Sequence, residues 1–153
     1  MNIMDILDCS IADGEGVRIA LYVSGCDHKC KGCHNPESWD CNAGTLFTED
    51  KKQTLFNLVQ RPYIDGITLT GGDPLHKCNI KETTALCKEF KEKFPNKTIW
   101  LYTGSVYEDI KDMEIMKYID TLVDGEFRIE ERDITLPFRG SKNQRIIKME
   151  DNK

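Results

Sequence analysis

The sequence lacks the features that mark a membrane protein, a secreted scaffold or a nucleic-acid binder. No apolar run among the 153 residues approaches the roughly 20 residues that a membrane-spanning helix needs. The first residues include Asp5 and carry no basic cluster, so we expect no secretory leader. The formal net charge is −5, and no basic stripe with interleaved aromatic residues is present. We therefore expect a cytoplasmic protein without a membrane or nucleic-acid partner.

Cysteine is too sparse, and its count is wrong, for a scaffold held together by disulfides. The chain has seven cysteines, an odd number and a low density for that class. In a reducing cytoplasm, clustered cysteines hold metal more often than they form disulfides. The chain also lacks a Ser–His–Asp motif or a paired-carboxylate motif, so general acid–base hydrolysis is not indicated.

Three of the cysteines lie in one short segment, Cys26, Cys30 and Cys33, with the spacing C-x3-C-x2-C. Soft thiolate ligands select zinc or an iron–sulfur cluster over hard cations. A closed structural site normally takes four protein ligands, so a set of three leaves one metal position for a small molecule. The spacing alone also allows a zinc knuckle completed by His28, His34 or Cys41.

The rest of the chain alternates between strand and helix patterns. We predict strands at residues 17–24, 64–70, 97–103, 119–124 and 145–149. We predict helices that begin after Thr48 and after Asn79, which forms a capping box with Glu82, and a third helix marked by Val106, Ile110 and Met113. Such alternation indicates parallel strands joined by crossover helices. A closed eight-stranded barrel needs about 250 residues. The prediction is one α/β domain over residues 1–153, either a partial, open parallel β/α barrel or an open doubly wound sheet.

Polar and glycine residues stand where four of these strands end. Cys26, Gly71, Thr103 and Asp124 each finish or follow a predicted strand. Because chemistry gathers at the carboxyl ends of parallel strands, we expect the four to face one mouth. Taken singly, Gly71-Gly72 is equally a tight turn, Thr103 a β-branched residue that closes a strand, and Asp124 a turn acid.

Several motifs together resemble a known family. They are DGEGVR (13–18), SGCDHKCKGCHNP (24–36), TLTGGDPL (68–75), LYTG (101–104), VDGEF (123–127) and FRGSKNQR (138–145). In order and spacing they are similar to the glycyl-radical-enzyme activases of the radical S-adenosylmethionine superfamily. The last motif is most similar to the subfamily that acts on anaerobic ribonucleoside-triphosphate reductase.

The resemblance implies a fold of the radical S-adenosylmethionine type and a specific chemistry. Cys26, Cys30 and Cys33 would bind a 4Fe–4S cluster, and S-adenosylmethionine would chelate its fourth iron. Reductive cleavage of that molecule gives methionine and a 5′-deoxyadenosyl radical, which takes hydrogen from a glycine on the large catalytic subunit of anaerobic ribonucleotide reductase. A low-potential reductant such as flavodoxin would supply the electron. The alternatives are the activase of another glycyl-radical enzyme such as pyruvate formate-lyase, a queuosine-pathway-type radical enzyme, and a non-enzymatic zinc or electron-transfer module.

The resemblance also assigns cofactor-binding residues. Gly71, Gly72 and Asp73 correspond to the family's Gly-Gly-Glu motif, which receives the methionine ammonium group. Gly32 stands where the family usually has an aromatic residue, so only its backbone would border the adenine. Thr103 and Asp124 would hold the ribose, the methionine or a cation.

Other polar residues keep two interpretations. Arg18 is either a surface or ion-paired arginine or part of the site. The basic run at 138–145 is either a solvated loop or a segment that helps to close the site or meets the large subunit. Cys87 and Cys9 are predicted to pack in the interior. Cys41 and Cys78 lie near the site motifs in sequence but have no ligand spacing of their own.

Overall fold

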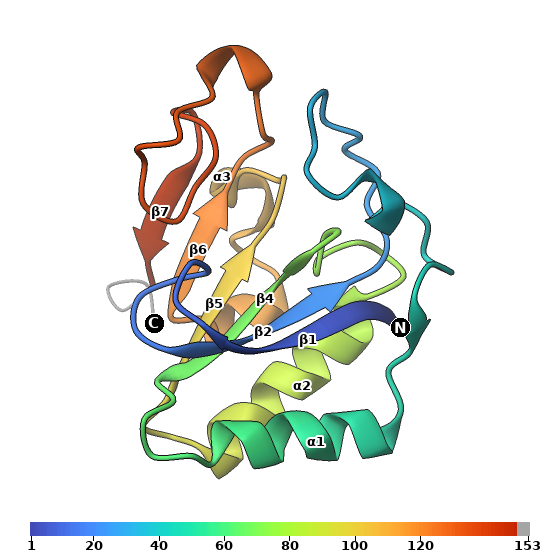
Figure 1. Ribbon diagram of the computed structural model, residues 1–153, viewed down its shortest axis with the longest axis vertical. Helices are drawn as coiled ribbons and strands as arrows, with labels where there is room; N and C mark the ends of the chain where they lie inside the picture. Colours follow the sequence, from blue (N-terminus) through green and yellow to red (C-terminus); the bar gives the residue numbers. More distant parts are fainter. Residues whose placement is uncertain (150–153) are drawn as a thin grey trace.

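The computed structural model describes residues 1–149, and its centre is one seven-stranded mixed sheet (Figure 1). The strands lie in the order β3-β1-β2-β4-β5-β6-β7. They are β1 Asn2–Ser10, β2 Arg18–Val23, β3 Thr45–Leu46, β4 Gly66–Gly71, β5 Thr98–Tyr102, β6 Thr121–Asp124 and β7 Arg145–Lys148. The helices are α1 Glu49–Val59, α2 Ile80–Lys93 and α3 Tyr107–Ile110, with short 3-10 turns η1 Pro36–Ser38, η2 Glu114–Lys117 and η3 Ile129–Glu131.

The four central strands, β2, β4, β5 and β6, run parallel, as the alternating pattern predicts. Their register places Val23 beside Gly71 and Tyr102 beside Val123, so their carboxyl ends meet at one edge of the sheet. Apolar residues along them, including Ile19 and Leu101, are fully buried. Consecutive residues such as Ile67, Thr68 and Leu69 are fully buried, so both faces of the central strands are covered.

The outer strands differ from the all-parallel expectation. β1 and β3 pair antiparallel on one side, and β7 pairs antiparallel with β6 on the other. β1 reaches β2, and β6 reaches β7, without a crossover helix, which allows the antiparallel direction. Within residues 1–149, β3 and β7 do not pair with each other, so the sheet is open rather than closed. The prediction of an open α/β sheet is confirmed.

Helices α1 and α2 lie side by side below the sheet in Figure 1. Nζ of Lys52 in α1 lies 2.9 Å from a carboxylate oxygen of Glu89 in α2. The Phe56 ring packs edge-on against the Phe94 ring, with 5.9 Å between the ring centroids. Thr48 caps α1 as predicted, because its hydroxyl accepts a hydrogen bond from the N–H of Lys51.

Two local predictions are wrong. Asn79 precedes α2, but its side chain does not cap the helix; instead its amide donates to the Ser24 carbonyl at 2.7 Å. Cys9 is exposed, with a positive φ of 64°, because it lies at an irregularity in the β1–β2 pairing. Cys87, in contrast, is fully buried as expected.

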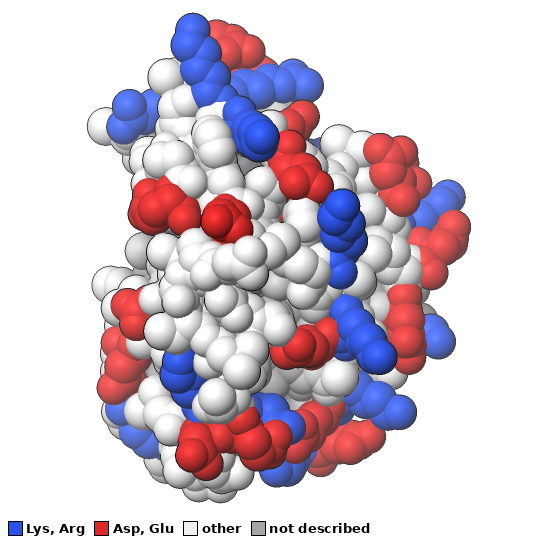
Figure 2. All heavy atoms as spheres, turned by 90° about the vertical axis from the view of Figure 1, so that its right-hand side faces the viewer, with Lys and Arg blue, Asp and Glu red and all other residues white. Residues whose placement is uncertain are grey.

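The surface carries both signs of charge. On the face in Figure 2, acidic and basic side chains are interspersed around an area at its centre and left where few charged side chains are seen. Within residues 1–149, no helix combines the length and apolar character that crossing a bilayer requires.

Candidate iron–sulfur and cofactor site

The cysteine loop begins where β2 ends and stands over the carboxyl edge of the parallel strands (Figure 1). Cys26, Cys30 and Cys33 are free thiols of intermediate exposure. All three line one cavity whose opposite wall is formed by the ends of β4 and β5, including Gly71 and Thr103. The loop and two of the strand ends expected to share a mouth therefore meet.

The environment of the sulfurs suits bound iron. Backbone N–H groups of His28 and Lys29 point at the Cys26 sulfur, and the Asn35 N–H is 3.4 Å from the Cys33 sulfur. Such hydrogen bonds to sulfur stabilise thiolate ligands of iron–sulfur clusters. Burial raises the pKa of Cys26 to about 11, and burial also raises the pKa of Cys30. Metal binding would displace these protons, which is the usual coupling of metal and thiol titration.

The spacing of the sulfurs separates a cluster from a single zinc ion. Two thiolates on one tetrahedral zinc lie about 3.8 Å apart, given Zn–S bonds of about 2.3 Å. Among residues 1–149, the group of three Cys, His, Asp or Glu ligands that gathers within 4.8 Å is Cys41, His76 and Cys78, and not the three loop cysteines. The three loop sulfurs are therefore spread more widely than the ligands of one zinc ion.

Gly71 and Gly72 permit the cysteine loop to approach the end of β4. Gly71 has a φ of +100°, and a Cβ there would lie 2.6 Å from the Val23 nitrogen. A Cβ on Gly72 would lie 2.6 Å from the Gly25 carbonyl oxygen. Only glycine fits at these two positions because backbone occupies the space of a side chain.

Asp73 follows these glycines and is almost fully buried. Its carboxylate accepts hydrogen bonds from the Thr103 hydroxyl at 3.0 Å and the Leu75 N–H at 2.9 Å. His28, in the cysteine loop, places Nε2 2.8 Å from the same carboxylate, and this hydrogen bond is the main reason that the pKa of His28 is raised. Asp73 therefore ties the loop to the ends of β4 and β5.

A larger cavity of about 580 Å³ continues outward from the cysteines. Its volume lies in the range of small-molecule and cofactor pockets. The β6–β7 connection supplies the outer wall, with Phe127, Phe138, Arg139 and Gln144. In Figure 1 this connection rises opposite the cysteine loop, so the two segments flank the mouth. The basic run at 138–145 thus contributes to closing the site.

Other predicted residues lie at the margin of this site. Asp124 is buried at the end of β6, but its carboxylate accepts from Arg145 Nε at 3.1 Å and from the Tyr107 N–H at 2.8 Å. Gly32 is an exposed loop residue with a φ of +80° and packs near Ile129. Neither residue is part of the walls of the two cavities described here.

Arg18 is at the opposite end of β2 from the cysteine loop. Its guanidinium is buried and donates to the carbonyls of Ile67 and Thr98, each at 2.8 Å. Burial lowers its pKa to about 10. Its contacts give it a structural role in joining three strands, which differs from both interpretations of the sequence.

Comparison with known proteins agrees with this geometry. Residues 12–147 match the family described as a 4Fe-4S single cluster domain. The chain is 43% identical to the anaerobic ribonucleoside-triphosphate reductase-activating protein of Enterobacteria phage T4, with 95% of this chain and 93% of that protein covered. The chain belongs to the anaerobic ribonucleoside-triphosphate reductase-activating protein family. The family members of Haemophilus influenzae and Escherichia coli are 39% and 36% identical over 95% and 94% of this chain, and over 97% and 96% of their own lengths.

The structure adds site residues that spacing does not indicate. Tyr102 precedes Thr103 and lines both cavities, and its hydroxyl donates to the Phe138 carbonyl at 2.6 Å. Gln144 also lines both cavities, and its side-chain oxygen accepts a hydrogen bond from the Gly140 N–H at 2.9 Å. Both residues belong to sequence motifs that carried the family resemblance. Membership of those motifs was the one indication in the sequence that these residues lie at the site. Cys41 and Cys78 lie together beside Gly25, at the start of the cysteine loop, and are joined to each other.

Proposed function

We propose that this protein is an iron–sulfur enzyme of the radical S-adenosylmethionine type that places a glycyl radical on the large catalytic subunit of anaerobic ribonucleoside-triphosphate reductase. The observation that carries the proposal is the cavity shared by three free thiols and the glycine-rich end of β4. Family membership supports the choice of partner, since the relatives are named for activating that reductase.

Cys26, Cys30 and Cys33 would hold a 4Fe–4S cluster by three of its irons. When bound, the reduced cluster supplies the electron that cleaves S-adenosylmethionine into methionine and a 5′-deoxyadenosyl radical, which abstracts hydrogen from the partner's glycine. The open sheet with four parallel central strands is consistent with a partial β/α barrel of this enzyme type.

The residues around the thiols would position S-adenosylmethionine. Gly71 and Gly72 expose backbone at the cavity wall, where the methionine ammonium group would bind. Thr103 lines the same wall. Gly32, an exposed residue of the loop that carries the thiols, would offer its backbone to the adenine at the margin of the site. Asp73 and Asp124 would act by fixing the strand ends, because their carboxylates already accept hydrogen bonds from neighbouring protein groups.

The outer cavity would admit the partner's glycine and exclude water. Aromatic residues from the β6–β7 connection, Phe127 and Phe138, line it beside Cys30 and Cys33. A radical confined by apolar walls meets only its intended hydrogen. We propose a cytoplasmic protein reduced by a low-potential donor such as flavodoxin.

The basic run would contribute to the partner surface through Lys142. Arg139 donates to the Gln144 carbonyl at 2.6 Å and Arg145 pairs with Asp124, whereas the Lys142 side chain is exposed. Lys142→Glu is expected to weaken association with the reductase while the iron content stays constant. Unchanged affinity for the reductase would remove Lys142 from the partner surface.

The deciding experiment mixes the reduced, anaerobically purified protein with S-adenosylmethionine and the large reductase subunit. We expect a glycyl doublet in the electron paramagnetic resonance spectrum, together with 5′-deoxyadenosine. Cys33→Ala is expected to give neither product, and the matched control Cys9→Ser, at an exposed cysteine outside the site, to give both.

Each other outcome contradicts part of the proposal. A doublet with pyruvate formate-lyase but not with the reductase would reassign the partner. Absence of 5′-deoxyadenosine from a reduced, cluster-containing sample would exclude the cleavage chemistry and leave an electron-transfer protein.

A further inference from the structure

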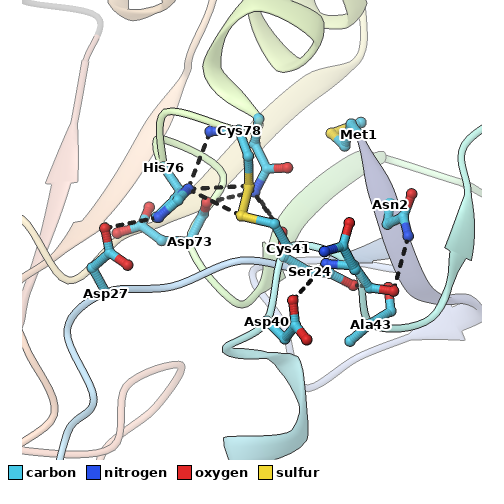
Figure 3. The surroundings of a disulfide bond; sticks show 12 residues. Met1, Asn2, Ser24, Asp27, Asp40, Cys41, Ala43, Asp73, His76 and Cys78 are labelled. Atoms are coloured by element: carbon cyan, nitrogen blue, oxygen red, sulfur yellow. Dashed lines mark hydrogen bonds and ion pairs between the residues drawn. A yellow bond between two sulfur atoms is a disulfide. The ribbon is translucent and has the colours of Figure 1, made fainter.

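A second sulfur site lies against the start of the cysteine loop, beside Gly25 and Asp27 (Figure 3). Cys41 and Cys78 are 37 residues apart in sequence and form a disulfide, with their Cα atoms 6.5 Å apart. His76 places Nδ1 3.0 Å from the Cys78 sulfur and 3.6 Å from the Cys41 sulfur. These three ligand atoms lie within 4.8 Å of one another.

A carboxylate orients the imidazole of His76 toward the sulfurs. Nε2 of His76 is 2.8 Å from Oδ2 of Asp27, and the histidine side chain is only 7% exposed. With Nε2–H donating to Asp27, Nδ1 carries a lone pair, which is consistent with its acceptance of the Cys78 N–H at 3.1 Å. Metal-bound histidines typically donate their second N–H to a carboxylate in this way, which fixes the tautomer and raises the basicity of the ligand.

We propose that, in the reduced protein, Cys41, His76 and Cys78 bind one zinc ion, and that the disulfide is the metal-free, oxidised form of the same site. Two thiolates and an imidazole are ligands that zinc prefers. In a tetrahedral zinc site the sulfur–nitrogen distances are about 3.6 Å, given the usual Zn–S and Zn–N bonds. Nδ1 of His76 already stands at this separation from the Cys41 sulfur, at 3.6 Å, and is closer to the Cys78 sulfur, at 3.0 Å. Reduction therefore has to let the Cys78 sulfur move away from both the Cys41 sulfur and the imidazole.

The two states are connected by a balanced exchange. A dithiol reductant gives two electrons and two protons to the Cys41–Cys78 disulfide, whose S–S bond breaks to leave two thiols. The reductant is oxidised to its own disulfide. Zinc then replaces the thiol protons of Cys41 and Cys78, releasing two protons to solvent. A water molecule would complete the coordination. That the reduced state is the working state rests on the proposed function, because a low-potential cluster operates where protein thiols are reduced.

The zinc site would support the loop that carries the cluster cysteines. From the Cys41 side, the Ser38 carbonyl accepts from the Gly25 N–H at 2.6 Å. From the Cys78 side, the Asp73 N–H donates to the Gly25 carbonyl at 2.7 Å. Gly25 itself packs on the sulfurs, since a Cβ there would lie 2.5 Å from the Cys78 sulfur. Zinc would therefore join the two segments to which Gly25, the neighbour of Cys26, is bonded.

The test measures zinc and iron on the cluster-containing protein. The protein is reduced anaerobically with a phosphine, incubated with zinc chloride, separated from free metal, and analysed by inductively coupled plasma mass spectrometry. We expect one zinc per chain in the wild type and in the matched control Cys9→Ser. Cys41→Ser and Cys78→Ser are expected to lose it, and Asp27→Asn to bind zinc about 10-fold more weakly.

A second measurement needs no variant and so does not depend on the folding of the mutants. Zinc K-edge absorption of the wild type should give two sulfur neighbours and one imidazole nitrogen. The proposal is overturned if the reduced wild type retains no zinc, or if zinc persists in Cys41→Ser and Cys78→Ser. Neither readout involves S-adenosylmethionine. The zinc proposal can therefore fail while the proposed function stands, and the proposed function can fail while the zinc proposal stands.

Discussion

The two cysteine groups of this protein are neighbours, yet they suit different metals. The loop cysteines, Cys26, Cys30 and Cys33, line an open cavity and their sulfurs do not gather within the reach of one ion. The ligand atoms of Cys41, Cys78 and His76 all lie within 4.8 Å of one another. Both groups supply soft ligands, so ligand chemistry alone does not separate them. The separation between the ligand atoms does: a wide set of three fits a cluster, and a narrow set fits a single ion.

The largest expected effect comes from removing a loop cysteine. Cys26→Ala, Cys30→Ala or Cys33→Ala is expected to abolish cluster binding, because two protein ligands remain for a four-iron group. Iron and sulfide analysis with the visible absorption spectrum measures this directly. Cys41→Ser is the matched change in the other group, and this variant should keep the iron bound at the loop cysteines. Equal iron loss in the two kinds of variant would contradict the assignment of iron to the loop cysteines alone.

Breaking the Cys41–Cys78 bond should lower the free energy of unfolding rather than the iron content. The bond closes a loop with a sequence separation of 37 residues. The chain-entropy relation gives a loss of roughly 3 to 4 kcal/mol in the free energy of unfolding for such a loop. Urea unfolding of Cys78→Ser and of Cys9→Ser, both fully oxidised and free of thiol reductant and zinc, measures the difference. Equal stability of the two variants would show that the pair does not hold the fold.

A pair of glycines tests how closely the end of β4 must approach β2. Gly71 and Gly125 have similar φ angles, +100° and +97°, but a Cβ would lie 2.6 Å from backbone at Gly71 and no closer than 3.6 Å to any atom at Gly125. Gly125→Ala should cost about 1 kcal/mol from backbone strain alone. Gly71→Ala should cost roughly 3 kcal/mol, because β2 has to move. Similar unfolding free energies would contradict the crowding at Gly71.

The smallest predicted effects come from two carboxylates, one for each cysteine group. Asp73 accepts from Thr103 and lies 2.8 Å from His28, while Asp27 contacts His76. Asp73→Asn is expected to speed iron loss about 10-fold under a chelator while leaving zinc in place. Asp27→Asn should weaken zinc and spare iron. Equal changes in both metals from either variant would show that neither carboxylate acts mainly on its own cysteine group.

Sequence predicted the parts of the site that depend on local spacing. The loop cysteines follow a strand directly, and Gly71-Gly72 ends the next parallel strand, so the register brings them together. Thr103 reaches the same cavity for the same reason. The strand segments and the Thr48 cap are also local features, and they are confirmed.

The remaining features depend on contacts between distant segments. Nothing near Cys41 indicates that it meets Cys78, because their meeting depends on how the segment after η1 packs on the turn before α2. Asn79 has a good capping sequence, but the Ser24 carbonyl competes successfully for its amide. Strand β1 was not predicted, since Asp5 and Asp8 interrupt its apolar pattern and its pairing with β2 stabilises it instead.

The central claim is that three cysteine ligands leave one iron of the cluster free to bind S-adenosylmethionine. Electron–nuclear double resonance on the reduced protein, with the amino nitrogen of S-adenosylmethionine labelled with nitrogen-15, tests it most directly. The account predicts a hyperfine coupling between that nitrogen and the cluster. A spectrum of the reduced cluster with no nitrogen-15 coupling, and unchanged when S-adenosylmethionine is added, would contradict it.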